Sequence, residues 1–158
     1  MLDDTRDFSS VPSSIELLFE NEKLDIMKIL CLLYSISVKS QRYATISEIL
    51  FYFSLVNYNL IRIFEDENYT SSPNQYFRFQ ARFNPLLIKM ENLKLIEIKA
   101  NIFIKTEDIK LKVTSEGKSF YEESETEFLR KLQEKFNEVF IIVQFTNANE
   151  KKLKEGKL

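Results

Sequence analysis

Two short stretches in the second half of the chain alternate apolar and charged residues. Residues 93–99 read Leu-Lys-Leu-Ile-Glu-Ile-Lys, and residues 110–113 read Lys-Leu-Lys-Val. Apolar side chains at every second position are typical of strands with one buried and one solvent-exposed face. The pattern therefore predicts a β-hairpin, and Thr114 or Ser115 after it predicts the cap of a helix.

Hydrophobic positions at helical spacing predict helices before this hairpin. The first covers residues 23–38 and follows Asn21, a residue type that often caps helices. The second runs from Thr45 to about Glu65, because Thr45 and Glu48 have the Thr-x-x-Glu spacing of a capping box. This second helix is apolar on most of its faces, so it is either buried at the centre of the fold or carries a second packing surface for a partner.

A third helix begins at Pro73, which suits the first turn of a helix. Pro85 lies inside this helix and removes a backbone donor, so we expect a kink or restart near Asn84. After the hairpin, a long helix covers residues 116–143. Its expected buried seam is Phe120, Phe128, Leu132, Phe136, Val139 and Phe140.

These elements predict an α+β fold that is mostly helical, a winged helix-turn-helix with a β-hairpin wing and a long C-terminal helix. Residues 1–14 are a loosely ordered lead-in, residues 15–145 form the winged-helix domain, and residues 146–158 form a basic, solvated tail. A chain of 158 residues with 44% apolar composition is large enough for one such core.

Composition argues against most catalytic chemistry. The chain has no histidine, two glycines and one cysteine, so it lacks histidine-based acid–base catalysis, phosphate-cradling loops and cysteine metal clusters. We expect no enzyme activity, no cofactor and no metal. The first residues are acidic where a secretory signal is basic, and no apolar run approaches the roughly 20 residues that span a bilayer. We therefore expect a cytoplasmic protein without a membrane contact.

Charge is unevenly distributed along the chain, although the net charge is only −2. Residues 73–112 hold eight basic and four acidic residues, a local excess that could meet a polyanion. Lysines between apolar residues on a hairpin also keep an exposed strand soluble, so both interpretations stay open. The candidate nucleic-acid contacts are Arg78, Arg82, Lys89, Lys99, Lys105, Lys110 and Lys112.

Aromatic residues are the candidate contacts for a protein partner. The second and third helices are unusually rich in them, and aromatic anchors carry much of the binding energy in protein interfaces. Arg78 itself is flanked by Phe77 and Phe79, which suits an apolar groove at least as well as a phosphate. The predicted interface residues are Tyr52, Phe53, Tyr58, Phe77 and Phe79.

In several of its segments the chain resembles the middle component of bacterial ABC three-component systems, in particular the small subunit of Lamassu-type anti-phage defence complexes. The resemblance covers roughly residues 17–153. Its most distinctive part is residues 48–55, Glu-Ile-Leu-Phe-Tyr-Phe-Ser-Leu. Asp-Ile-Met-Lys-Ile-Leu at 25–30, Leu-Lys-Leu-Ile-Glu-Ile at 93–98, Val-Thr-Ser-Glu-Gly at 113–117 and a lysine-rich end add to it.

This resemblance implies a non-catalytic adaptor that joins an SMC-like or Rad50-like ATPase to an effector nuclease in a complex that senses phage or plasmid DNA. It transfers no catalytic residue, because the family has no fixed ones. The alternative is a stand-alone winged-helix transcriptional regulator that binds DNA and dimerises through the long C-terminal helix.

Overall fold

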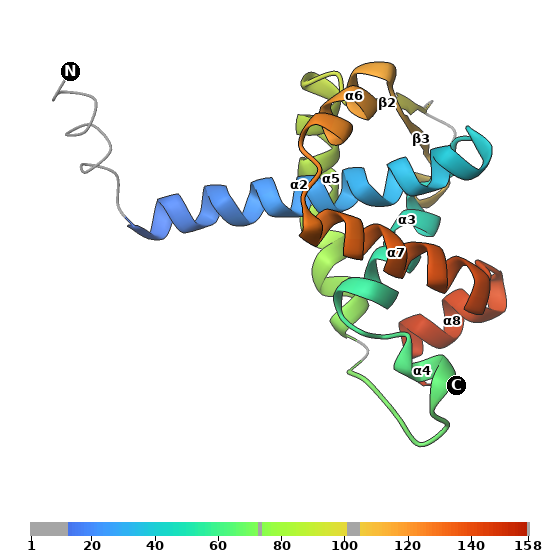
Figure 1. Ribbon diagram of the computed structural model, residues 1–158. Coiled ribbons are helices and arrows are strands. Elements are labelled where there is room, and N and C mark those ends of the chain that lie inside the picture. Colours follow the sequence, from blue (N-terminus) through green and yellow to red (C-terminus); the bar gives the residue numbers. More distant parts are fainter. Residues whose placement is uncertain (1–12, 73, 101–104, 158) are drawn as a thin grey trace, which may run out of the picture.

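The computed structural model describes residues 13–72, 74–100 and 105–157. In chain order, the elements of the described residues are α2 (Ser13–Ser40), β1 (Ala44–Thr45), α3 (Ile46–Asn57), α4 (Arg62–Glu65), α5 (Asn74–Asn92), β2 (Ile96–Lys99), the 3-10 turn η1 (Thr106–Asp108), β3 (Lys110–Val113), α6 (Ser115–Glu123), α7 (Glu127–Ile142) and α8 (Asn147–Glu155). Figure 1 shows the helices gathered around α3, with the small sheet at one side. The expected α+β, mostly helical class is confirmed.

The predicted hairpin is present, but its first strand begins at Ile96 and not at Leu93, which is exposed. Strands β2 and β3 pair antiparallel, with Ile96 opposite Val113 and Lys99 opposite Lys110. A third strand, β1, pairs with the other edge of β3 and puts Ala44 opposite Leu111. Strand β1 could not be predicted from the sequence, because two residues are too few to show an alternation.

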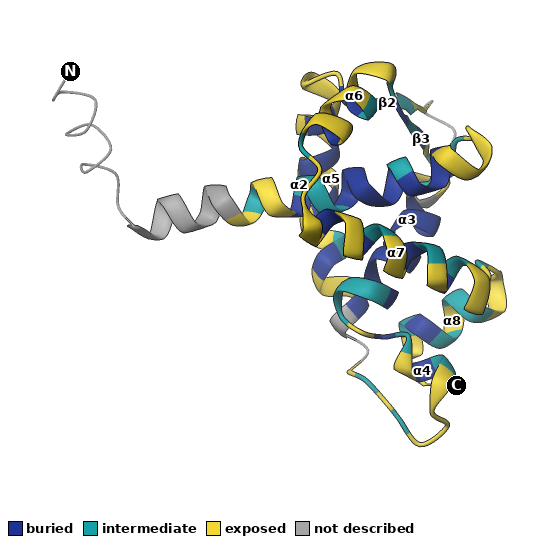
Figure 2. Cartoon of the chain, viewed as in Figure 1, coloured by how far each residue is buried: buried dark blue, intermediate teal, exposed yellow. Residues whose placement is uncertain are grey.

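Helix α3 forms the centre of the core. Every residue from Ile46 to Leu55 is buried, as Figure 2 shows. The predicted cap is confirmed in part: the Thr45 hydroxyl accepts a hydrogen bond from the Glu48 N–H at 3.1 Å. The Glu48 carboxylate does not complete a capping box, since it accepts two hydrogen bonds from Arg42 at 2.8 and 2.5 Å.

The predicted second helix is shorter than expected. Helix α3 ends at Asn57, and a separate single turn, α4, follows. Asn59 lies between them with a φ of 55°, a left-handed conformation that asparagine tolerates better than most residues. Leu60 and Ile63, which follow this turn, are buried in the core.

Helix α2 begins earlier than the pattern predicted. It runs for 28 residues from Ser13, so Asn21 lies inside it and does not cap it. The first half of α2 runs outward from the body of the molecule in Figure 1. Its second half crosses the core, where Ile29 to Leu33 are buried.

Helix α5 continues through Pro85, so the predicted restart near Asn84 is wrong. Proline has no N–H to donate to the carbonyl four residues earlier, that of Ala81. Ala81 and Pro85 are both exposed. This carbonyl can therefore bond to water, and the helix does not have to break.

The long C-terminal helix is divided in two, contrary to the prediction. Helix α6 ends at Glu123, and the Thr126 hydroxyl caps α7 by accepting from the Leu129 N–H at 3.2 Å. The change of direction leaves Phe120 and Phe128 43% and 52% exposed, so neither belongs to the predicted buried seam. The predicted burial is confirmed for Leu132, Phe136 and Val139, whereas Phe140 is half-buried.

The lysine-rich end is folded against the domain and is not a solvated tail. It forms α8, whose Leu153 is buried and which packs on α5. Gly156 ends this helix with a φ of 78°, and its carbonyl accepts a hydrogen bond from the Ser71 N–H at 2.8 Å. Lys151 is exposed, whereas Lys152 and Lys154 are half-buried, and Lys154 pairs with Glu150 and lies over the Tyr76 ring.

Cys31 lies where α2 meets α6 and α7. Its thiol accepts a hydrogen bond from the Tyr121 hydroxyl at 3.2 Å, and burial raises the pKa of Cys31 to about 11. An acid whose pKa is raised stays neutral, and the thiolate is the reactive form. We expect iodoacetamide at pH 8 to modify Cys31 at least about 100-fold more slowly in the native chain than in urea, since an unperturbed thiol has a pKa near 8.5. Equal rates, measured by mass spectrometry, would place Cys31 at the surface.

Candidate interaction surfaces

Three of the five aromatic residues predicted to contact a partner are core residues. The rings of Phe53 and Phe79 stack 4.0 Å apart at an angle of 6°, and neither residue is exposed. Tyr52 is also buried, and its hydroxyl donates to the Val143 carbonyl at 3.1 Å. The prediction is corrected for these three, because α2, α5 and α7 surround α3. The apolar faces of α3 are thus covered by other helices of the same chain.

The other two predicted interface residues differ in exposure. Tyr58 is half-buried, with its ring at the edges of Phe53 and Phe79. Phe77, on the outer side of α5, is 45% exposed. Among the five, Phe77 is therefore the residue best placed to reach another molecule.

An apolar stripe follows the exposed side of α5. Phe77, Ala81, Pro85 and Ile88 are all exposed and follow one another at intervals of four, four and three residues. Residues at these intervals lie on one face of a helix. Ile88 is 57% exposed and lay outside the predicted interface, although its spacing from Phe77 is visible in the sequence. We call these four residues the α5 stripe.

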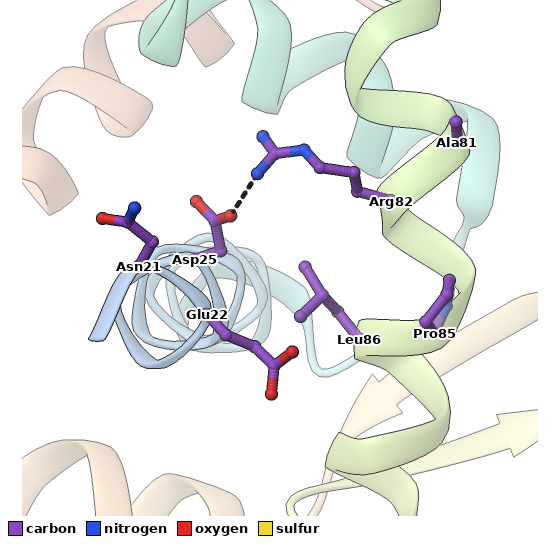
Figure 3. Close-up of a pocket in the computed structure, with 7 residues that line it drawn as sticks. All are labelled: Asn21, Glu22, Asp25, Ala81, Arg82, Pro85 and Leu86. Carbon is purple, nitrogen blue, oxygen red and sulfur yellow. Dashed lines mark hydrogen bonds and ion pairs between the residues drawn. The ribbon is translucent and has the colours of Figure 1, made fainter. Parts of the chain in front are cut away.

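A groove of about 310 Å³ separates α5 from the outer half of α2. Figure 3 shows Asp25 of α2 turned toward Arg82 of α5, and their charged groups lie 2.9 Å apart. About two turns further along α5 and one turn earlier along α2, Lys89 pairs with Glu22. The side chain of Asp25 is only 13% exposed, so Arg82 neutralises a carboxylate that has little access to water.

These ion pairs leave fewer basic side chains of α5 free to contact DNA. Arg82 and Lys89 were predicted nucleic-acid contacts, but both are occupied by acids of α2. Arg78 is exposed and forms no ion pair with any residue that the structure describes. The sequence showed the acidic character of the N-terminal part, but not that it lies beside these bases, because that contact joins residues 57 and 67 positions apart.

The other predicted bases lie at the hairpin. Lys105 is exposed at the start of η1. In the register of the sheet, Lys99, Lys110 and Lys112 share the face turned away from the core, because Ile96, Leu111 and Val113 occupy the inner face. Glu97 also lies on the outer face, opposite Lys112.

Tyr43 completes this outer face and was not recognised in the sequence. It precedes β1, and its hydroxyl donates a hydrogen bond to the Glu97 carboxylate, which raises the pKa of Tyr43. The ammonium groups of Lys99 and Lys112 lie 5.1 and 5.6 Å from the centre of its ring. We call Tyr43, Glu97, Lys99, Lys110 and Lys112 the sheet face.

No family model, curated protein or solved structure matches the chain. Within residues 13–72, 74–100 and 105–157, no group of three or more acidic or cysteine side chains is placed to hold a metal ion. None of the helices in the described part of the chain has the length and apolar character needed to cross a membrane.

Proposed function

We propose that the chain is a non-catalytic winged-helix adaptor subunit. It would link an SMC-like or Rad50-like ATPase to an effector nuclease in a complex that senses phage or plasmid DNA. The order α2, β1, α3, α5, β2, β3 and the strand order β1-β3-β2 agree with a winged helix, in which α5 takes the place of the recognition helix. The identity of the two partners follows from the resemblance described above.

The α5 stripe is the observation that carries the adaptor proposal. A helix that reads DNA needs free polar and basic side chains to reach base edges and phosphates. On α5, two bases are paired with α2 and the exposed side is lined by Phe77, Pro85 and Ile88. A surface of this kind favours a protein partner, because aromatic and aliphatic anchors provide most of the energy of such interfaces.

We expect Phe77→Asp with Ile88→Asp to prevent binding to the partner while the chain stays folded. Each side chain is about half exposed, so a carboxylate there remains in water, whereas in the complex it would be buried unpaired. Loss of even one anchor worth about 2 kcal/mol weakens binding roughly 30-fold. The measurement is co-purification and titration calorimetry with the coiled-coil ATPase or nuclease encoded beside this chain.

A matched control is available on other helices. Phe120→Asp with Ile141→Asp makes the same chemical change at exposed positions of α6 and α7. We expect this control to bind normally. If the Phe77→Asp, Ile88→Asp variant binds as tightly as this control, the α5 stripe is not part of the interface. If the neighbouring genes encode neither an ATPase nor a nuclease, the proposed partners are wrong.

The second candidate function is a stand-alone DNA-binding regulator. The lysines of the sheet face, which form no ion pair with any described residue, favour it. The division of the expected long C-terminal helix into α6 and α7 argues against dimerisation through one such helix. A regulator that reads sequence through α5 needs Arg78 and Arg82. Unchanged affinity for duplex DNA after replacing both by alanine would exclude this function.

A further inference from the structure

We propose that the sheet face binds the phosphate backbone of duplex DNA without reading its sequence. This contact goes beyond the proposed adaptor function, because it uses a surface other than the α5 stripe and can be measured on the isolated chain. It would let an adaptor hold its protein partner on α5 while the opposite side of the hairpin rests on DNA.

The sheet face carries three lysines and a single acid, Glu97, so its own residues leave an excess of positive charge. Lys99 lies directly opposite Lys110 on the neighbouring strand, and like charges in this position repel each other. None of the described residues forms an ion pair with Lys99, Lys110 or Lys112. The acid on this face, Glu97, accepts its hydrogen bond from the Tyr43 hydroxyl. A bound polyanion would relieve this repulsion.

Tyr43 gives the lysines a fixed arrangement. Its ring attracts the ammonium groups of Lys99 and Lys112, which lie within the 6 Å range of a cation–π contact. Lys110 and Lys112 are two residues apart on β3, which spaces their Cα atoms about 7 Å. Two positive charges, those of Lys110 and Lys112, therefore follow the middle strand β3, and Lys99 adds a third on the neighbouring strand β2.

The composition of the sheet face favours a phosphate backbone over an acidic protein segment. Besides the lysines, it presents Tyr43, Thr45 and Glu97, and no exposed aliphatic side chain is on the outer positions of the described strands. Protein interfaces generally need an apolar anchor. Lysine contacts with phosphate need none, because their free energy comes from the release of counterions.

The test measures binding of the isolated chain to a fluorescent duplex of about two helical turns by anisotropy, from 50 to 200 mM salt. Three phosphate contacts predict a slope of log affinity against log salt of about −2.7, and so a loss of about 40-fold over this range. Lys110→Gln should reduce the slope by about 1. Lys99→Gln, Lys110→Gln and Lys112→Gln together should abolish the salt-dependent binding.

Two controls separate local from general effects. The same three-charge change at three exposed lysines elsewhere, Lys135 on α7, Lys151 on α8 and Lys157 after it, should leave the slope at about −2.7. Arg78→Gln with Arg82→Gln should also leave it unchanged, because α5 does not take part. The thermal midpoint of each variant is measured by circular dichroism, and Lys110→Gln alone decides the question where the triple variant unfolds.

Binding that the sheet-face variants leave unchanged overturns the proposal, as does an equal loss in the Lys135, Lys151 and Lys157 control. A polyglutamate peptide that binds more tightly than the duplex at the same salt would assign the sheet face to an acidic protein segment and also overturn it. None of these outcomes involves the ATPase or the nuclease, so the adaptor proposal is tested separately.

Discussion

Replacing Phe53 by aspartate is expected to unfold the protein and not merely to detach a partner. The ring of Phe53 is fully buried and stacked on Phe79. Truncation of a buried phenylalanine to alanine costs about 3–5 kcal/mol, and a carboxylate at the same place adds the cost of burying a charge. Because small proteins are stable by only about 5–15 kcal/mol, Phe53→Ala should be strongly destabilised and Phe53→Asp unfolded. Urea unfolding followed by circular dichroism measures both.

Phe77→Asp is the matched control for this experiment. It makes the same change on α5, where the side chain is 45% exposed, and we expect a change of less than about 1 kcal/mol. Phe79→Ala should resemble Phe53→Ala, since each ring supports the other. A Phe53→Asp variant with a normal urea midpoint would show that this ring is not part of the core.

Gly117→Ala is expected to destabilise the protein by about 2 kcal/mol, with a larger loss for Gly117→Val. A Cβ atom at this position would lie 2.1 Å from the Leu95 carbonyl oxygen and 2.8 Å from the Val113 side chain. The carbonyl cannot move away freely, because it accepts a hydrogen bond from the Thr114 N–H at 3.0 Å. Helix propensity alone would favour alanine over glycine by about 1 kcal/mol, so the sign of the change shows which effect is larger.

Ser119→Ala tests propensity without the close contact. Ser119 is exposed on the same helix, and we expect this variant to be equally stable or more stable by a few tenths of a kcal/mol. The measurement is again the urea midpoint at constant slope. A stabilised Gly117→Ala would mean that α6 does not approach the start of β2 as closely as the structure shows.

The candidate surfaces could be predicted from the sequence only in part. The basic residues of the hairpin are exposed, as their alternation with apolar residues indicates. Arg82 and Lys89 belong to the same local excess of positive charge, yet α2 pairs with both. Local charge counts cannot reveal such pairing, because it depends on which helix packs beside which.

The aromatic residues show the same limit. Phe77 and Phe79 are two positions apart on one helix, and nothing in their type distinguishes them. Phe79 faces α3 and is fully buried, whereas Phe77 points outward. Two residues of separation turn a helix by about 200°, so neighbouring phenylalanines face opposite sides, and the position of the core decides which of them is exposed.

The sequence by itself determined the main helical regions, the hairpin and the caps at Thr45 and Thr114, because these depend on hydrophobic spacing and on side chains within a few residues. Tertiary structure alone decided the third strand, the burial of Phe53 and Phe79, and the ion pairs between α2 and α5. Each of these depends on residues that are distant in the chain and become neighbours only when the helices pack around α3.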